Sequence, residues 1–466
     1  MRVYHLLNGL VEFLSRRSSV LILSPYARNI GNCAEEIYYG LLAARRRGKR
    51  VVLLFPQPLF WKFKIELANQ ELFLLESEHC CLNDGVWCRL EGVLLTVVFV
   101  ILWRGYAMVR RILRVLHGVW PAVPFPWRNN IFYLIPSIGR SSLWQPEAVR
   151  EFSWEVVKRC NWKEQYDHYL PVRLQDEKRR AAEKLRVAMG VPLDRWFVCL
   201  HVREGGFRND GDLGANRNCS ILNYLDGIRV ITEAGGYIVR LGDPSMIPLP
   251  RIARVIDYPH TAFKSELMDL YLISECRFYL GVNSGPLDIA WLFQKPVLLT
   301  NLTEWTMSFP KRKGDLAIIK HIFSRSRNRF LSLREILEEP FECQSIRDAG
   351  GDYVMVENTP DEIRDVIFEH LTEPPNRPQS PLQEAFNAAR RAQVHRLLDG
   401  PIEFFSLNRR DDAVERYRFA SRADSVKGAL GRKFVQENWL ESSRNRGKRL
   451  QAGRVSRAPW RVESGA

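Results

Sequence analysis

The strongest constraint on the fold is a regular alternation of short apolar runs with helix-like stretches in residues 196–301. Apolar runs of strand length lie at residues 196–202, 237–241, 255–258, 278–283 and 297–301. Helix-like stretches lie between them at residues 221–234, 265–274 and 286–293. Because neighbouring parallel strands need a crossover connection of helix length, this alternation predicts an α/β fold with a doubly wound parallel sheet.

A shorter unit of the same kind opens the chain. An apolar run at residues 19–25 precedes the turn Asn29-Ile-Gly31-Asn32, and a helical stretch at residues 33–47 leads to a second apolar run at residues 50–55. A chain of 466 residues is too long for one hydrophobic core. We therefore expect two Rossmann-like domains, residues 1–190 and 191–375, that face each other across a cleft.

The remaining residues contain fewer apolar groups. A Thr-Pro-Asp-Glu sequence at residues 359–362 marks the start of a helix over residues 362–371, and helical patches follow at residues 382–398 and 426–440. We expect a helical extension over residues 376–443. Residues 444–466 are basic and interrupted by Ser and Gly, so they are expected to form a disordered tail.

The composition limits the partners and the compartment. The net charge of +15 and the pI of about 9.5 favour phosphates, nucleic acid or anionic lipid as partners. The nine cysteines form no C-x-x-C pair and are odd in number, which indicates a reducing compartment. Residues 1–19 lack the continuous apolar run of a secretory signal. We therefore expect a cytoplasmic protein.

Residues 92–120 have two interpretations. Residues 92–103 carry no charge but are too few to span a bilayer. In the basic stretch that follows, Arg104, Arg110, Arg111 and Arg114 alternate with apolar residues. The stretch is either a core helix whose arginines face solvent or a helix lying in the membrane interface. We expect the second, with peripheral attachment to the cytoplasmic face of the inner membrane as the result.

Ligands of open α/β sheets lie at the carboxyl ends of the strands, so polar residues at these ends are candidate binding residues. The run at 196–202 leads into a cluster of such residues: His201, Arg203, Glu204, Gly205, Gly206 and Arg208. Arg203 can bind a diphosphate with two parallel hydrogen bonds, and Glu204 is a candidate catalytic carboxylate. The alternative is an exposed Arg203 that pairs with Glu204.

Two further strand ends are polar: one carries Arg240 and Gly242, and the other carries Asp257. Another end reads Asn283-Ser284-Gly285-Pro and enters an apolar helix that contains Asp288. A helix N-terminus binds anions through its free amides, so this turn is predicted to bind a phosphate. The alternative function of Ser284 is simple capping of the helix.

The first turn of the chain belongs to the opposite wall of the expected cleft. Asn29, Gly31 and Asn32 follow the first apolar run and are candidate acceptor-binding residues. Glu36 is a candidate general base for the attacking hydroxyl. Glu35 and Glu36 also suit a first helical turn simply because acidic side chains interact favourably with the helix dipole there.

The motif His201-Val-Arg203 resembles the His-x-Arg element of fucosyltransferases, in which the arginine holds the donor diphosphate. The Ser284-Gly-Pro turn resembles bacterial heptosyltransferases, although Asp288 stands where these have a histidine, and Gly206 departs from the fucosyltransferase pattern. Over residues 201–301 and 316–371 the chain resembles bacterial GT-B glycosyltransferases of surface polysaccharides, a fold with two Rossmann-like domains.

The resemblance implies transfer of a sugar from a nucleotide diphosphate donor to a glycan or a lipid-linked glycan acceptor. No cofactor or metal is expected, although Asp210 and Asp212 form a D-x-D sequence that holds a metal in the other glycosyltransferase fold. A nucleotide-sugar 2-epimerase shares the fold and is the alternative enzyme. A nucleic-acid-binding protein is a further alternative, but the basic residues are scattered and form no recognised module, so nucleic acid is not an expected partner.

Overall fold

The computed structural model of the chain describes residues 20–23, 29–31, 33–35, 37–38, 41, 50–53, 68–77, 172–205, 215–305, 308–338, 351–399 and 426–445, together with the six positions 108, 112, 115, 116, 118 and 119.

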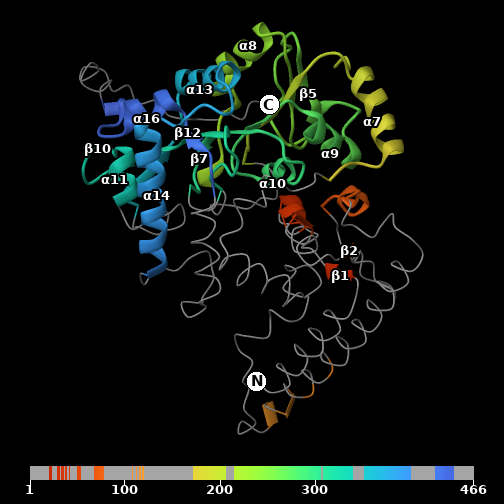
Figure 1. Cartoon of the computed structure of the whole chain (residues 1–466), viewed down its shortest axis with the longest axis horizontal. Helices are drawn as coiled ribbons and strands as arrows, with labels where there is room; N and C mark the ends of the chain where they lie inside the picture. The colour runs from red at the N-terminus through yellow and green to blue at the C-terminus, as the bar shows by residue number, and fades with distance from the viewer. Residues whose placement is uncertain are drawn as a thin grey trace, which may run out of the picture.

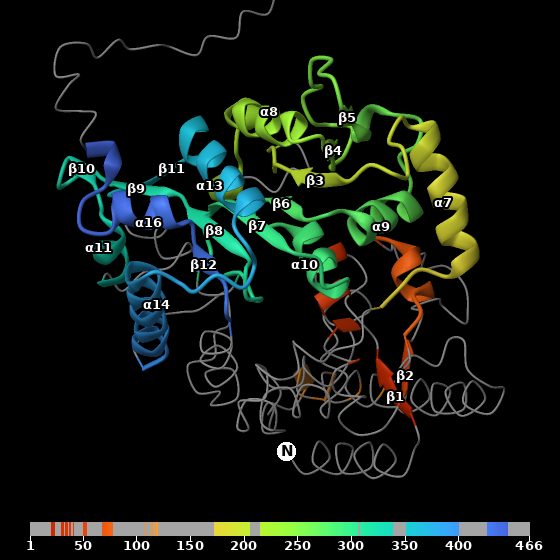
Figure 2. The ribbon, with the colours of Figure 1, turned by 45° about the horizontal axis from the view of Figure 1, so that its top comes forward.

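The described residues are arranged around a seven-stranded parallel sheet with the order β12-β8-β7-β6-β3-β4-β5 (Figure 2). The strands are β3 (Phe197–His201), β4 (Tyr237–Arg240), β5 (Val255–Asp257), β6 (Tyr279–Gly281), β7 (Val297–Leu302), β8 (Leu316–Ile319) and β12 (Ala429–Leu430). Numbered along the chain from β3, the first six strands stand in the order 3-2-1-4-5-6, which is that of a Rossmann sheet. The predicted α/β fold with a doubly wound parallel sheet is confirmed.

Helices cover both faces of this sheet. On one face lie α8 (Leu225–Glu233) and α13 (Pro360–Thr372), and on the other lie α9 (Glu266–Glu275) and α10 (Gly285–Leu292), with α7 (Asp176–Ala188) packed against α9 (Figure 2). Because neither face meets solvent, β3, β6 and β7 are buried along their whole length. The helix predicted at residues 362–371 is α13, which begins two residues earlier, at Pro360, and has Thr359 as its N-cap in a capping box with Glu362.

Smaller elements surround the sheet. An antiparallel sheet of order β10-β9-β11 follows it, with β9 (His321–Ser324), β10 (Arg329–Phe330) and β11 (Tyr353–Val356). The further helices are α11 (Leu333–Glu338), α14 (Pro381–Asp399) and α16 (Arg432–Asn438). Single 3-10 turns are η1 (Gln70–Leu74), η6 (Ala215–Arg217), η7 (Ile221–Tyr224) and η8 (Tyr258–His260).

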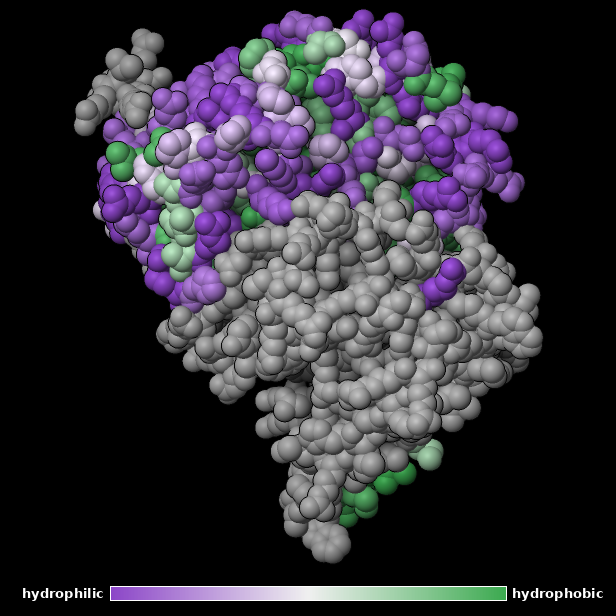
Figure 3. Space-filling view, viewed as in Figure 1, coloured by the Kyte–Doolittle hydropathy of each residue, from purple (hydrophilic) through white to green (hydrophobic). Residues whose placement is uncertain are grey.

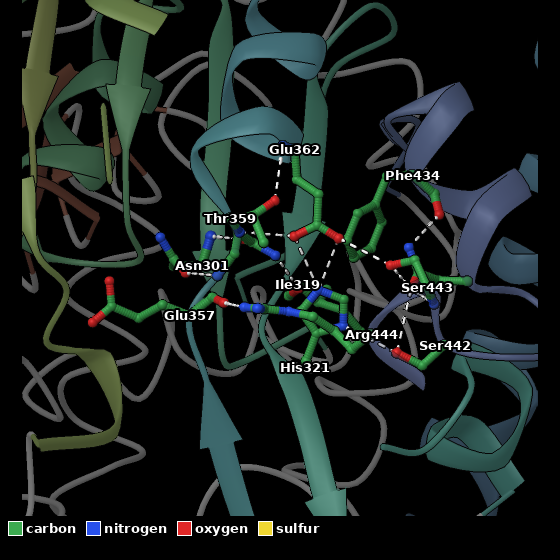
Figure 4. A network of polar contacts seen from close by, with 12 residues as sticks. Asn301, Ile319, His321, Glu357, Thr359, Glu362, Phe434, Ser442, Ser443 and Arg444 are labelled. Atoms are coloured by element: carbon green, nitrogen blue, oxygen red, sulfur yellow. Dashed lines mark hydrogen bonds and ion pairs between the residues drawn. The ribbon is translucent and has the colours of Figure 1, made fainter. Parts of the chain in front are cut away.

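The C-terminal part differs from the prediction in two places. The expected helical extension contains a strand, because Ala429 and Leu430 pair with β8 and so extend the large sheet by one strand. Arg444, expected to open a disordered tail, is held in the structure, since its guanidinium donates from Nη2 to the Glu357 carbonyl oxygen at 2.5 Å (Figure 4). Residues 446–466 lie outside the described residues.

The N-terminal part contains the predicted βαβ unit. Strands β1 (Val20–Leu23) and β2 (Arg50–Leu53) pair in parallel, and the described positions between residues 30 and 41 are helical. Near η1, Asn69 Nδ2 donates to the Glu266 carbonyl oxygen at 2.9 Å, and Gln70 N donates to Glu266 Oε2 at 2.8 Å. These bonds attach the N-terminal part to the start of α9.

The predicted membrane segment is described only at six helical positions. Its apolar residues there are exposed: Met108 by 63%, Ile112 by 50%, Val115 by 66%, Leu116 by 46% and Val119 by 81%. They form the green patch at the lower end of Figure 3 and the short orange stretch at the lower end of Figure 1. The alternative of a buried core helix does not fit these positions. Among the described helices, none is both long and apolar enough to span a bilayer.

Candidate functional site

The strand order of the large sheet reverses between β3 and β6, and ligands of Rossmann sheets bind outside the carboxyl ends of the strands at such a reversal. His201 at the end of β3 lies opposite Gly281 at the end of β6. Beyond this pair Val282 N donates to the His201 carbonyl oxygen at 3.2 Å. The reversal thus brings together two of the sequence-predicted clusters, the one after His201 and the one after Gly281.

His201 is a buried imidazole with a free hydrogen-bonding atom. Its side chain is 6% exposed, and burial lowers its pKa to about 4, with the nearby Arg203 cation acting in the same direction. The imidazole is therefore neutral at physiological pH. Its Nδ1 has no hydrogen-bond partner among the described residues. Since buried polar atoms are nearly always bonded, this unpartnered nitrogen at the end of β3 makes His201 a candidate ligand-binding residue.

The turn before α10 lacks the hydrogen bond expected of its capping residue. Ser284 occupies the N-cap position, but its hydroxyl makes no capping hydrogen bond, so the alternative of simple capping does not describe this structure. The preceding Asn283 is buried and its amide contacts Thr303 at the end of β7, with Nδ2 3.3 Å from Thr303 Oγ1. Asn283 thus ties the turn to β7. Pro286 has no backbone N–H and Leu287 N donates to the Ser284 carbonyl oxygen at 2.9 Å, so the Gly285 amide and the Ser284 hydroxyl are the groups of this turn that remain for an anion.

The predicted acceptor turn lies in direct contact with this helix. A methyl group added to Gly31 would lie 2.5 Å from Asp288 Oδ2 and 2.7 Å from Gly285 Cα, and one added to Gly285 would lie 2.9 Å from Ile30 Cγ2. Only residues without side chains allow the two backbones to approach so closely. Asn29 precedes the N-terminal helical positions that begin at Ile30, and its carbonyl oxygen accepts from Cys33 N at 2.9 Å. The structure therefore joins the two predicted walls of the site; Asn32 and Glu36 lie outside the described residues.

Asp288 lies in an unusual electrostatic environment at this contact. Burial raises its pKa to about 7, and the neighbouring Lys311 ammonium acts against this rise. Lys311 Nζ lies 3.7 Å from the centre of the Trp291 ring. Glu304 follows β7, and burial raises its pKa against the effect of Arg217. Glu304 could have been found from the sequence as a polar residue after a strand, whereas Lys311 stands in a loop with no signal.

Arg203 is buried, whereas the alternative interpretation of the sequence made it an exposed side chain. Its side chain is 6% exposed, and Nη1 donates to Asn218 Oδ1. It does not pair with Glu204. Gly205 lies beside the same asparagine, because a methyl group on it would lie 3.1 Å from Asn218 Nδ2. Gly206 and Arg208 lie outside the described residues.

Three of the predicted rim residues bind one another. Arg240 is fully buried, donating from Nη2 to Glu204 Oε1 at 2.7 Å and from Nη1 to Asp257 Oδ1 at 3.0 Å. The other carboxylate oxygens accept from Ile247 N and Leu249 N, both at 2.8 Å. This bridge fixes the loop after β4. Nearby, Gly242 has a φ of +150°, a conformation that favours glycine.

Within the described ranges, no three His, Cys, Asp or Glu side chains gather in a way that could hold a metal ion. Asp210 and Asp212 lie outside these ranges. Comparison with known proteins adds no relative, since no protein-family model, no curated protein and no solved structure matches the chain. The function is therefore inferred from the residues of the site.

We predict that Arg240→Met lowers the free energy of unfolding by about 3–5 kcal/mol, because the variant leaves two buried carboxylates without their cation. Urea denaturation measures the change. The matched control is Arg229→Met, whose ion pair with Asp226 is exposed and whose loss should cost less than about 1 kcal/mol. Equal effects of the two substitutions would contradict the structural function of Arg240.

Proposed function

We propose that the chain is a GT-B glycosyltransferase that moves a sugar from a nucleotide diphosphate donor to a hydroxyl of a glycan or lipid-linked glycan. The observation that carries the proposal is the contact of Gly31 with Gly285 and Asp288 at the strand reversal. It places the start of the N-terminal helix against the helix N-terminus at which a Rossmann sheet binds a phosphate. The motif resemblances at Arg203 and Ser284 point to the same reaction.

The proposed donor site holds the diphosphate without a metal. The Gly285 amide at the start of α10, the Ser284 hydroxyl and His201 Nδ1 supply hydrogen bonds, and Arg203 supplies a positive charge. As the bond between the anomeric carbon and the diphosphate oxygen breaks, the electron pair leaves with the diphosphate. These groups stabilise the negative charge that develops on it.

Asp288 is the described carboxylate best placed to accept the proton of the attacking hydroxyl. Its Oδ2 borders the backbone of Gly31, and it lies one helical turn from the proposed phosphate position at Gly285. Glu36 remains the base proposed from the sequence. We assign Glu204, Arg240 and Asp257 a positioning function, because they bind one another and two backbone amides.

We predict that at least one of GDP, UDP, ADP and dTDP raises the melting temperature of the wild type, since a ligand at 100 times its Kd stabilises by ~2.7 kcal/mol. Arg203→Ala should abolish this rise, and Arg203→Lys should retain part of it. Differential scanning fluorimetry measures both. A full shift in Arg203→Ala would remove Arg203 from the site, and no shift with any nucleotide in the wild type would contradict the proposed function.

We predict that Asp288→Asn lowers the rate of sugar transfer to water by about 10²–10⁴-fold, the contribution of a general base. The donor is the nucleotide sugar whose diphosphate gives the largest melting shift, and the assay measures release of that diphosphate. Because the base must be ionised, the wild-type rate should rise with pH through the raised pKa of Asp288, and the variant should lose this dependence. If Glu36→Gln gives this result instead, Glu36 is the base.

We also propose that the exposed stripe formed by Met108, Ile112, Val115, Leu116 and Val119 holds the protein on the anionic cytoplasmic face of the membrane. The stripe is apolar, and the sequence places Arg110, Arg111 and Arg114 between its members. Apolar insertion and attraction of arginines to anionic headgroups act together in interfacial helices. An acceptor linked to a lipid would then be available at the same surface.

We predict that Ile112→Glu with Leu116→Glu moves the protein from the pellet to the supernatant in sedimentation with phosphatidylglycerol vesicles. The matched control is Leu193→Glu with Phe368→Glu, which changes two apolar residues of similar exposure (54% and 58%) elsewhere on the surface. The control variant should still sediment. Failure of the wild type to sediment would contradict membrane attachment.

A further inference from the structure

A large groove lies at the edge of the main sheet opposite the proposed donor site. It borders the amino ends of β6, β7, β8 and β12, where Phe278, Pro296, Leu316 and Ala429 line it. The end of α13, the segment after it and the first part of α14 form the other walls. Because Rossmann sheets bind their nucleotide at the carboxyl ends of the strands, this groove is a separate feature.

The groove has the size and the surface of a small-molecule site. Its volume is about 820 Å³. Pockets for small ligands usually measure ~300–1,000 Å³ and combine apolar walls with a few polar groups. Leu371, Pro374 and Val426 add to the apolar surface that Phe278 and Pro296 supply. These dimensions favour a small molecule as the occupant.

The charged lining of the groove is biased towards cations. Seven arginine and lysine side chains line it, against four carboxylates. Three of the carboxylates, Asp315, Glu369 and Glu373, already bind a backbone amide or an arginine. The fourth, Glu384, is exposed. The cations therefore exceed the carboxylates that could neutralise them, and the groove attracts anions.

Three of these cations have no carboxylate partner. Within the described ranges, the side chains of Lys313 and Arg391 form no ion pair and no hydrogen bond. The Arg277 guanidinium lies on the ring of Trp196, 4.5 Å from its centre, and pairs with no carboxylate of this part of the chain. A phosphate monoester carries a charge of about −1.5 to −2 at neutral pH, so it matches this excess better than a single carboxylate does.

The wall of the groove also contains a buried hydrogen-bond acceptor without a donor. Asn387 is only 5% exposed. Its Nδ2 donates to the Gly428 carbonyl oxygen and to Gln379 Oε1, both at 3.0 Å, whereas its Oδ1 has no partner among the described residues. Because buried polar atoms are nearly always bonded, this oxygen indicates that a donor group of a ligand, such as a hydroxyl, completes the wall.

Helix α14 presents three polar residues to the groove from a fixed position. Gln383, Asn387 and Arg391 are four residues apart, so they lie on one face of the helix. Gln383 Nε2 donates to the Leu430 carbonyl oxygen at 2.6 Å, and the bond from Asn387 to Gly428 lies beside it. These bonds attach α14 to β12, so Arg391 stands on an element that is anchored to the sheet.

We infer that the groove binds a phosphate monoester of a hydroxyl-bearing group, which is either a sugar phosphate or a nucleoside monophosphate. The cations without carboxylate partners supply the charge that binds the phosphate, and Asn387 accepts from a hydroxyl. The apolar residues at the amino ends of the strands contact the carbon skeleton. The groove and the proposed donor site lie at opposite edges of the sheet, so this inference does not depend on the proposed function.

Isothermal titration calorimetry with glucose 1-phosphate and AMP tests the inference. The better of the two should bind the wild type at least about tenfold more tightly than inorganic phosphate, because the hydroxyl adds a hydrogen bond to the charge interaction. Lys313→Ala with Arg391→Ala should weaken this binding at least about tenfold. The matched control is Arg180→Ala with Lys184→Ala, which removes two exposed cations of α7 outside this groove. The control should bind like the wild type.

Arg203→Ala separates this groove from the proposed donor site. Its binding of the better phosphate ester should equal that of the wild type, since Arg203 follows the carboxyl end of β3. Loss of binding in Arg203→Ala, or unchanged binding in the Lys313 and Arg391 double variant, would place the ester elsewhere and overturn the inference. It is also overturned if neither ester binds more tightly than inorganic phosphate. The preference between glucose 1-phosphate and AMP identifies the ligand as a sugar phosphate or a nucleotide.

Discussion

Two helices begin at the same point in this molecule, one at Ile30 and the other at Gly285, and the rest of the site depends on their contact. Both helix N-termini carry partial positive charge, so bringing them together is unfavourable unless an anion lies nearby. The Asp288 carboxylate lies at the contact and supplies negative charge when it is ionised, at pH values above its raised pKa of about 7. A bound diphosphate would supply more, which gives the two parts of the chain a physical reason to come together around a donor.

Polar residues at the strand ends divide into two kinds that the structure separates clearly. In the Arg240 bridge all four carboxylate oxygens of Glu204 and Asp257 are hydrogen-bonded, and Arg240 Nε is the atom left without a partner among the described residues. In contrast, His201 Nδ1 is a buried polar atom left without a partner among the described residues, and Ser284 leaves its hydroxyl out of the helix cap. Glu204 and Asp257, whose oxygens are all bonded, therefore support the rim, and the unbonded His201 and Ser284 atoms are the ones proposed to bind a ligand.

The sequence predicted the alternating strands and helices well because a buried parallel sheet consists of apolar runs separated by amphipathic helices. It could not show that Arg240 is buried between Glu204 and Asp257, because an arginine at a strand end has the same local pattern whether it meets solvent or two carboxylates. Lys320 was missed for a related reason: its bond to the backbone oxygen of Asn218, the partner of Arg203, depends on the folded path of the chain and leaves no local pattern. Strand β12 has only two residues, too few for a period to be recognised.

The late arrival of β12 has a consequence for biosynthesis. Its two residues pair with β8 from a position far along the chain, after β9–β11, α13 and α14 have been made. Until the ribosome has released that segment, the hydrogen-bonding edge of β8 has no partner in the large sheet, and unpaired edges recruit strands from other molecules. Nascent or truncated chains that lack residues 426–445 should therefore depend on chaperones to stay monomeric, whereas the finished chain closes this edge itself.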